Sequence, residues 1–208
     1  MIDPINLPLI LTAAFLATAS PGPSTLAIAG TAMAHGRRQA LSLAAGIVTG
    51  SWAWSSAAAL GLGAVMHANA WVFELLRYLG AAYLMYLAFR SARSALTPAN
   101  SMLQPVNAAS RRVAFGKGLA MHLTNPKAII FFGALYSVGV PADAAPWQIA
   151  SVVLVVGAMS LIVFLFYALL FSGPKVVAVY LRMRRWFEGA FAIAFGYASL
   201  KVLNARLG

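Results

Sequence analysis

A short polar stretch, Ser20-Pro21-Gly22-Pro23-Ser24, interrupts a long apolar run near the start of the chain. Pro23 lacks an amide hydrogen and both prolines clash with the preceding turn, so we expect this stretch to open a helix. The helix that restarts after Pro23 would direct its amides and its positive dipole end at the opening, where a carboxylate could bind. All five residues are therefore candidate binding residues. The alternative is a kink that only shapes packing.

A second polar stretch, Thr124-Asn125-Pro126-Lys127, interrupts a later apolar run, with His122 one turn before Asn125. Lys127 lies about 12 residues from either end of that run, or ~18 Å along a helix, which is too far for its side chain to reach water. A charge in the middle of a membrane costs at least ~2.5 to 3.5 kcal/mol, so Lys127 should face a cavity or a partner. We add His122, Asn125, Pro126 and Lys127 to the binding residues. A structural ion pair, or a cap on the carbonyls of a broken helix, is the alternative role for Lys127.

Groups that could support catalysis are few. The chain has four acids, three histidines and no cysteine. The histidines do not have the spacing of metal ligands. Paired carboxylates or a Ser-His pair are the usual catalytic sets, and Ser20 and His122 could meet only through an accident of the fold. We therefore expect no enzyme activity, no cofactor and no metal site.

The acids themselves suggest local ion pairs. Glu74 precedes Arg77 by three residues, a spacing that places both on one helix face. Glu188 follows Arg184 by four residues. Proton coupling needs a titrating group inside the protein, and His122 and Glu74 are the candidates.

The composition sets the class of fold. The chain has 208 residues, of which 62% are hydrophobic and 9% charged. Soluble domains carry about 25% charged residues, which excludes a water-soluble fold. A membrane-spanning helix uses about 20 apolar residues, and there are six such runs. They cover about residues 5–33, 39–66, 71–95, 115–140, 147–171 and 186–203, with a polar loop at 97–112.

The net charge of +11 comes from basic residues in the gaps between these runs. Nucleic-acid-binding proteins gather such residues on one wet face, so we expect no nucleic-acid partner. Cytoplasmic loops of membrane proteins carry the excess of Lys and Arg, which predicts that both termini face away from the cytoplasm. Three alternate gaps hold Arg37, Arg38, Arg90, Arg93, Arg111, Arg112, Lys117, Lys175, Arg182, Arg184 and Arg185.

The two halves of the chain resemble each other. A shift of 103 residues places Pro23 on Pro126 and Gly30 on Gly133, so both interruptions fall at one position of the repeat. Three runs per half would give the halves opposite orientations, and paired breaks in such inverted repeats mark transporter substrate sites. We predict an all-α polytopic membrane protein with six transmembrane helices, built as two inverted three-helix repeats with helices 1 and 4 broken. The prediction is one domain, 1–208, with repeat 1 at about 1–96, a loop at about 97–112 and repeat 2 at about 113–208.

Several short motifs follow one another along the chain. They are P-G-P at 21–23, His35-Gly36-Arg37-Arg38, Gly46, Gly50, Gly80-Ala81-Ala82-Tyr83-Leu84, Asn125-Pro126-Lys127-Ala128 and Phe131. In this order and spacing they resemble the LysE/RhtB-type amino-acid exporter family. The resemblance covers essentially the whole chain, and it implies a bacterial inner-membrane protein of six helices that exports amino acids or close derivatives with the energy of an ion gradient.

The chain departs from the family pattern at Ser24, at Ser51, where the family often has an acid, and at Leu135-Tyr136-Ser137. An acid at Ser51 would suit a cationic substrate, so its absence favours a neutral amino acid. The expected partners are thus a small amino acid and the lipid bilayer, with a homo-oligomer left open. We expect export coupled to an ion gradient, with protons as the preferred ion. The alternative is a passive channel for small solutes.

Overall fold

The computed structural model describes residues 5–20, 22–68, 70–97, 105–141 and 144–204, and all regular secondary structure in these ranges is helical. The eight helices are α1 (Leu7–Ala19), α2 (Pro23–His35), α3 (Arg37–Ala68), α4 (Ala70–Leu96), α5 (Arg111–Leu123), α6 (Pro126–Gly139), α7 (Pro146–Leu170) and α8 (Pro174–Asn204). The all-helical class predicted from composition is therefore present.

Both predicted interruptions are present and separate helices of similar length. α1 and α2 have 13 residues each, while α5 has 13 and α6 has 14. Pro23 and Pro126 each occupy the first turn of the second helix, where a missing amide hydrogen costs nothing and the fixed φ angle suits a helix. The axes of α1 and α2 differ by 47°.

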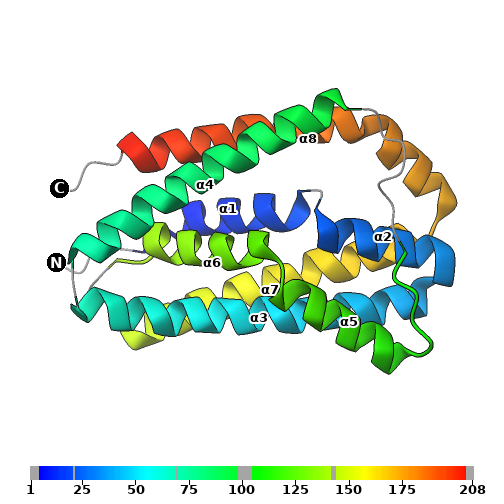
Figure 1. The fold of residues 1–208 in the computed structure, drawn as a ribbon, viewed down its shortest axis with the longest axis horizontal. Coiled ribbons are helices and arrows are strands. Elements are labelled where there is room, and N and C mark those ends of the chain that lie inside the picture. The colour runs from blue at the N-terminus through cyan, green and yellow to red at the C-terminus, as the bar shows by residue number, and fades with distance from the viewer. Residues whose placement is uncertain (1–4, 21, 69, 98–104, 142–143, 205–208) are drawn as a thin grey trace.

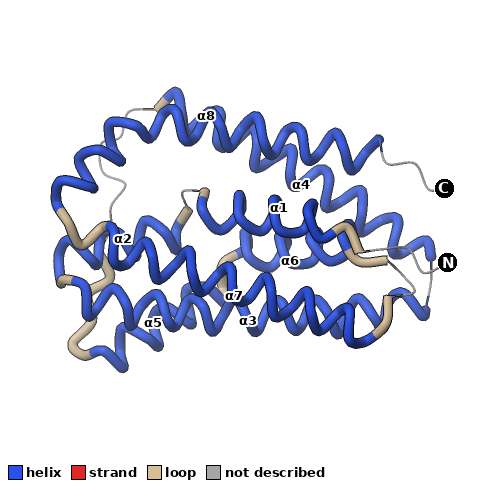
Figure 2. Tube along the Cα trace, turned by 180° about the vertical axis from the view of Figure 1, so that it is seen from behind, coloured by secondary structure: helices blue, strands red, loops and turns tan. Residues whose placement is uncertain are grey.

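The described helices make six passes of the long axis when each broken pair counts as one pass (Figure 1). α1 begins and α8 ends at the same end of the molecule, where α3 meets α4 and α6 meets α7. The view from behind shows both breaks near the middle of the long axis (Figure 2). α4 packs along α8 on one side, and α3 packs against both α5 and α7 on the other.

Two glycines allow α3 and α5 to approach closely. A Cβ on Gly46 would collide with the backbone carbonyl of Phe115, and one on Gly118 would collide with that of Leu43. Gly50, four residues after Gly46, lies against the His122 side chain, where an added Cβ would be 3.0 Å from the His122 Cβ. The G-x-x-x-G pair at 46 and 50 thus serves helix packing within the chain, which is the usual role of this spacing.

The last helix differs from the expectation. The sixth run was predicted at about 186–203, with a gap before it, yet α8 begins at Pro174 and includes most of that gap. The basic residues of this segment indicated a loop in the sequence. In the fold, Arg184 is buried and paired with Glu188, so the helix continues through it. Arg184 Nη2 donates to the Ser94 hydroxyl at 2.6 Å, and Glu188 Oε1 lies 3.9 Å from Arg184 Nε, which confirms the predicted local pair.

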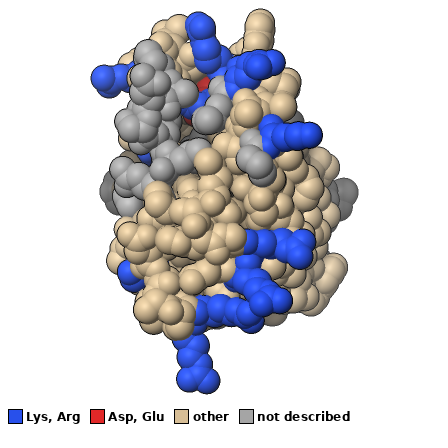
Figure 3. Space-filling view, turned by 90° about the vertical axis from the view of Figure 1, so that its right-hand side faces the viewer, with Lys and Arg blue, Asp and Glu red and all other residues tan. Residues whose placement is uncertain are grey.

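The end of the molecule where α2, α4 and α7 finish is basic. Figure 3 views this end and shows Lys and Arg side chains spread over it. Exposed basic side chains there include Arg37 and Arg38 at the start of α3, Arg111 and Arg112 at the start of α5, and Lys175 at the start of α8. The other predicted pair, Glu74 with Arg77, lies outside the described side chains.

By length and hydropathy, α7 alone qualifies as a single membrane-crossing helix among the described residues. α1 and α2 qualify together as one broken span. α3, α4 and α8 have 32, 27 and 31 residues, each more than the ~20 that a crossing needs, but they are less apolar. Buried polar side chains contribute to this lower hydropathy, among them Ser51, Ser55 and Glu188.

Candidate functional site between the broken helices

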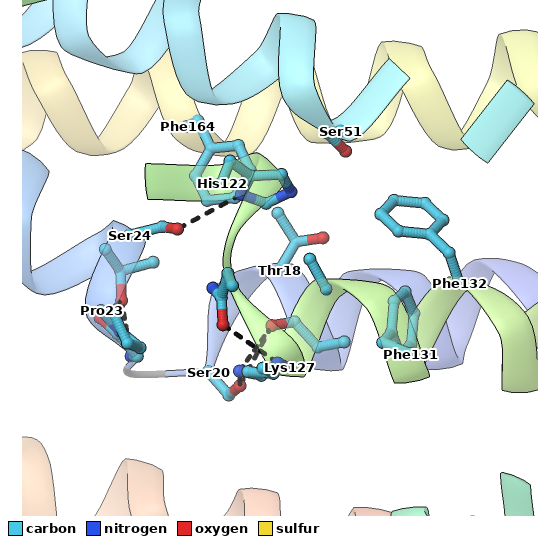
Figure 4. Close-up of a pocket in the computed structure, with 15 residues that line it drawn as sticks. Thr18, Ser20, Pro23, Ser24, Ser51, His122, Lys127, Phe131, Phe132 and Phe164 are labelled. Atoms are coloured by element: carbon cyan, nitrogen blue, oxygen red, sulfur yellow. Dashed lines mark hydrogen bonds between the residues drawn. The ribbon is translucent and has the colours of Figure 1, made fainter. Parts of the chain in front are cut away.

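A cavity lies where the two interrupted passes meet (Figure 4). Its empty volume, including the open mouth, is about 440 Å³. Ser24, His122, Ser20 and Lys127 lie on one side of it, and Phe131 and Phe132 lie on the other. The lining residues are Ala17, Thr18, Ser20, Gly22, Pro23, Ser24, Thr25, Ser51, His122, Asn125, Lys127, Ala128, Phe131, Phe132 and Phe164.

Lys127 joins the two broken passes. Its ammonium nitrogen donates hydrogen bonds to the Ser20 hydroxyl at 2.6 Å and to the Ala17 carbonyl at 3.1 Å. The last carbonyls of a helix have no partners within the helix and carry its negative dipole end, so a cation there is stabilising. The Lys127 side chain, which comes from the first turn of α6, therefore caps the end of α1.

Other side chains fix this geometry. Tyr83 of α4 donates from its hydroxyl to the Lys127 carbonyl at 3.1 Å, and Tyr167 of α7 donates to the Ala19 carbonyl at 2.7 Å. The Asn125 side chain accepts from the Lys127 amide at 3.0 Å and so caps the start of α6. The neighbouring helices α4 and α7 thus each fix one of the two breaks.

The N-terminus of α2 lies beside the same ammonium group. Gly22 is extended, with φ −162° and ψ 179°, and its amide donates to the Thr25 hydroxyl at 2.8 Å. A Cβ on Gly22 would lie 3.4 Å from Lys127 Nζ, an ordinary contact distance, so the amine lies beside the start of α2. Two positive features, a helix N-terminus and an ammonium, thus meet at one edge of the cavity.

His122 lines the other polar edge. It is buried, its Nδ1 lies 3.3 Å from the Ser24 hydroxyl, and its ring meets Phe164 of α7 edge-on. Ser24 is the second residue of α2, so this contact ties the end of α5 to the start of α2. Ser51 of α3 completes the polar lining and donates to the Ser160 hydroxyl of α7 at 2.9 Å.

A second, larger cavity adjoins the first across the broken segment. Its empty volume is about 1850 Å³, including open solvent, and it extends toward the basic end between α2, α4 and α8. Ser20, Gly22, Pro23 and Lys127 line both cavities, so these residues form the partition between them. The remaining lining residues of the larger cavity include Leu26, Ala27, Arg90, Arg93, Pro105, Val106 and Glu188.

The amino-acid sequence was compared with models of known protein families. A model of the LysE type translocator family matches residues 15–206, which is nearly the whole chain. The chain belongs to the LysE type translocator family.

Named relatives of this LysE translocator are similar over most of their length. The threonine efflux protein of Escherichia coli K12 is 33% identical over 206 residues, covering 95% of this chain and 98% of the relative. The leucine efflux protein of Klebsiella pneumoniae is 27% identical over 169 residues, covering 79% and 77%. The homoserine/homoserine lactone efflux protein of Salmonella typhimurium is 33% identical over 127 residues, covering 61% and 60%. No solved structure matches the chain.

Most residues that the sequence of this LysE translocator nominated meet at the small cavity. Seven of them line it: Ser20, Gly22, Pro23, Ser24, His122, Asn125 and Lys127. Pro21 lies outside the described residues, and Pro126 begins α6 but its side chain is not described. Lys127 takes the role stated as the alternative, a cap on the broken helix, and it lines the cavity as well.

Sequence reasoning missed part of the lining. Thr18, Thr25, Phe132 and Phe164 were not singled out, because nothing in their spacing distinguishes them from packing residues. Ser51 and Phe131 appeared only in the family comparison, although both line the cavity. The departure at Ser51 was the one available signal for a lining residue on α3.

Proposed function

We propose that the protein is a secondary active transporter that exports neutral amino acids across the bacterial inner membrane, driven by the proton gradient. The observation that carries this proposal is the cavity between two broken helices, with Lys127 and the N-terminus of α2 at one edge. Broken helices that meet at mid-membrane, with a helix N-terminus directed at an anionic group, are the usual construction of secondary-transporter sites. The relatives named as threonine and leucine efflux proteins support amino-acid export.

The substrate carboxylate would bind at the positive edge. Lys127 Nζ and the first turn of α2 supply charge and donors there, while Ser20 and Ser24 supply hydroxyl groups. Among the described residues that line the small cavity there is no acid, so nothing there would pair with a second positive charge on a substrate. These features support a neutral amino acid over lysine or arginine.

We propose that the six passes are six membrane spans in two inverted repeats. The order of elements supports this, because each half has a broken pair followed by two long helices: α3 and α4 in the first half, α7 and α8 in the second. The basic end would face the cytoplasm, and both termini would then lie on the opposite side. A fusion of alkaline phosphatase to Gly208 should be active, because that enzyme folds only outside the cytoplasm, and an inactive fusion would reverse the orientation.

The asymmetry of the two halves supports alternating access. α6 packs against α4, with Tyr83 bonded to the first turn of α6. Its counterpart α2 has no comparable packing against α8 among the described residues, and the larger cavity lies between them instead. We interpret this arrangement as the state open to the cytoplasm. The opposite state would bring α2 to α8 and separate α6 from α4.

Coupling to protons requires a group that can gain and lose a proton within the transport path. His122 lines the small cavity beside Ser24, so it is the candidate that the geometry favours. The side chain of Glu74, the other candidate, lies outside the described residues.

Uptake into everted membrane vesicles tests the function. Vesicles from an expression host without its own amino-acid exporters would receive radiolabelled neutral amino acids, with and without a proton gradient. Export predicts saturable uptake that an uncoupler abolishes. Uptake that rises linearly with amino-acid concentration and does not change with the proton gradient would show a passive channel. No uptake of any of the twenty amino acids would contradict the proposal.

A further inference from the structure

Two arginines of α4 line the larger cavity. Arg90 and Arg93 lie three residues apart, a spacing that places them on one face of the helix, and both are exposed. Among the described residues the one ion pair is that of Arg184 with Glu188, so neither Arg90 nor Arg93 is paired with an acid there. A positive charge that faces an open cavity is available to an anion that enters it.

The acid that lines the same cavity does not neutralise these two arginines. Glu188 of α8 is buried, its Oε1 accepts a hydrogen bond from the Ser94 hydroxyl at 2.7 Å, and the same oxygen lies 3.9 Å from Arg184 Nε. Its charge is therefore committed to the contact between α4 and α8. With Lys127, the described lining of the larger cavity has three cations against this one paired acid.

The three cations form a series that leads to the broken segment. Tyr83 of α4 bonds to the Lys127 carbonyl, so Lys127 lies at the level of Tyr83. Arg90 follows Tyr83 by seven residues, or ~10.5 Å along the helix, and Arg93 lies ~4.5 Å further on. Because α4 runs toward the basic end (Figure 1), Arg93 is the nearest to that end and Lys127 the farthest from it. Lys127 also lines the small cavity, so the series ends at the proposed substrate site.

A carboxylate suits this series of cations. Guanidinium groups bind carboxylates and phosphates through two parallel hydrogen bonds. A phospholipid phosphate is the other source of such an oxyanion, but it would stay at the level of the lipid headgroups. The series instead continues to Lys127 at the break, near the middle of the long axis (Figure 2). A soluble carboxylate can follow the whole series, which favours it over a lipid.

On the basis of the proposed export function, we propose that Arg90 and Arg93 form an entry site in the larger cavity, which binds the carboxylate of a cytoplasmic amino acid before Lys127 does. The substrate would pass from this site to the partition between the two cavities, where Lys127 lies. Every amino acid has this carboxylate, so the entry site serves whichever side chain the small cavity accepts. It belongs to the state open to the cytoplasm, because closing α2 onto α8 would remove the larger cavity.

Everted vesicles, which present the cytoplasmic face to the medium, test the entry site with a radiolabelled amino acid that the parent protein transports. The double variant Arg90→Gln with Arg93→Gln should raise the half-saturating concentration roughly two- to tenfold, because it removes two exposed charge contacts. Its maximal rate should be retained, since the small cavity is intact. Arg90→Lys with Arg93→Lys keeps both charges and should stay close to the parent. Arg37→Gln with Arg38→Gln is the matched control, because both residues are exposed at the basic end and line neither cavity.

Two further measurements distinguish an entry site from a structural role of the two arginines. Potassium chloride on both sides of the membrane screens exposed charges, so it should raise the half-saturating concentration of the parent and leave that of the double glutamine variant unchanged. In right-side-out vesicles the substrate arrives from the other face and does not meet the entry site first. The half-saturating concentration for uptake there should be the same in the parent and in the double glutamine variant.

Reconstitution of the purified protein into phosphatidylcholine, with and without phosphatidylglycerol, distinguishes the two sources of the anion. A substrate carboxylate predicts that the double glutamine variant has the same effect in both lipids. An effect confined to vesicles with phosphatidylglycerol would overturn the inference and assign the arginines to a lipid headgroup. An unchanged half-saturating concentration in the double glutamine variant would also overturn it while export stands. Absence of uptake of any amino acid by the parent would instead overturn the export function itself.

Discussion

Lys127 and Ser20, 107 positions apart in the chain, are joined by a hydrogen bond of 2.6 Å from the ammonium nitrogen to the hydroxyl oxygen. This bond connects the end of α1 to the beginning of α6. It also forms part of the partition between the small cavity and the larger one. The same ammonium group therefore stabilises the break and lines the proposed substrate site.

Replacing Lys127 by Met should reduce transport strongly. A hydrogen bond to a charged group is worth ~1.5 to 3 kcal/mol, so substrate affinity should fall roughly ten- to hundredfold. Vesicle uptake over a range of concentrations measures this as a rise in the half-saturating concentration. Lys175→Met is the matched control, because Lys175 is exposed at the basic end and does not line either cavity. Full transport by folded Lys127→Met would leave this lysine with the helix-cap role alone.

The pair Arg184 and Glu188 should be essential for stability. Both side chains are buried, and Ser94 of α4 bonds to each of them, at 2.6 Å from Arg184 Nη2 and 2.7 Å from Glu188 Oε1. Removing one member of a buried pair leaves an uncompensated charge, which costs ~3 to 5 kcal/mol. Glu188→Ala should therefore lower the thermal unfolding temperature in detergent by several degrees.

A compensating change provides the control for this prediction. The double variant Arg184→Met with Glu188→Leu has no unpaired buried charge, so it should recover most of the lost stability. A double variant that is less stable than Glu188→Ala would show that the two residues do not act as a pair.

Gly46→Ala should disrupt packing although alanine favours helices. The new Cβ would collide with the Phe115 carbonyl, a backbone atom that cannot rotate away, and overpacking of this kind typically costs ~1 to 3 kcal/mol. Gly116→Ala is the matched control on α5, because a Cβ there meets nothing within 4 Å. Its helix should gain up to ~1 kcal/mol from the substitution. Comparable unfolding temperatures for the two variants would contradict the close approach of α3 and α5.

The reactivity of a cysteine introduced into α2 tests to which side of the membrane the larger cavity opens. The chain has no cysteine, so a single introduced one reports without background. Leu26→Cys, on the wall of the larger cavity, should react with a membrane-impermeant maleimide in everted vesicles and should be protected in right-side-out ones. Leu135→Cys, buried in the core on α6, should remain unreactive in both. Labelling of Leu26→Cys from the outer side alone would show that the larger cavity faces away from the cytoplasm.

The sequence by itself determined where the two helices break. Proline has no amide hydrogen and a ring that clashes with the preceding turn, so Pro23 and Pro126 act on their own backbone whatever surrounds them. Charge in the middle of an apolar run identified Lys127 for a similar reason, since an ammonium at that depth must face a cavity or a partner. Helix breaks and buried charges of this kind can be predicted from the sequence without coordinates.

Tertiary structure alone decided which groups meet. Whether Lys127 reaches Ser20, or His122 reaches Ser24, depends on how passes about a hundred residues apart pack together, and no local preference contains that information. The start of α8 was missed for the same reason, because Arg184 looks like a loop residue until its buried partners are known. Phe164 belongs to the cavity only because α7 carries it to the side of His122. Proline and charge act within one segment, whereas a binding site is made by contacts between segments.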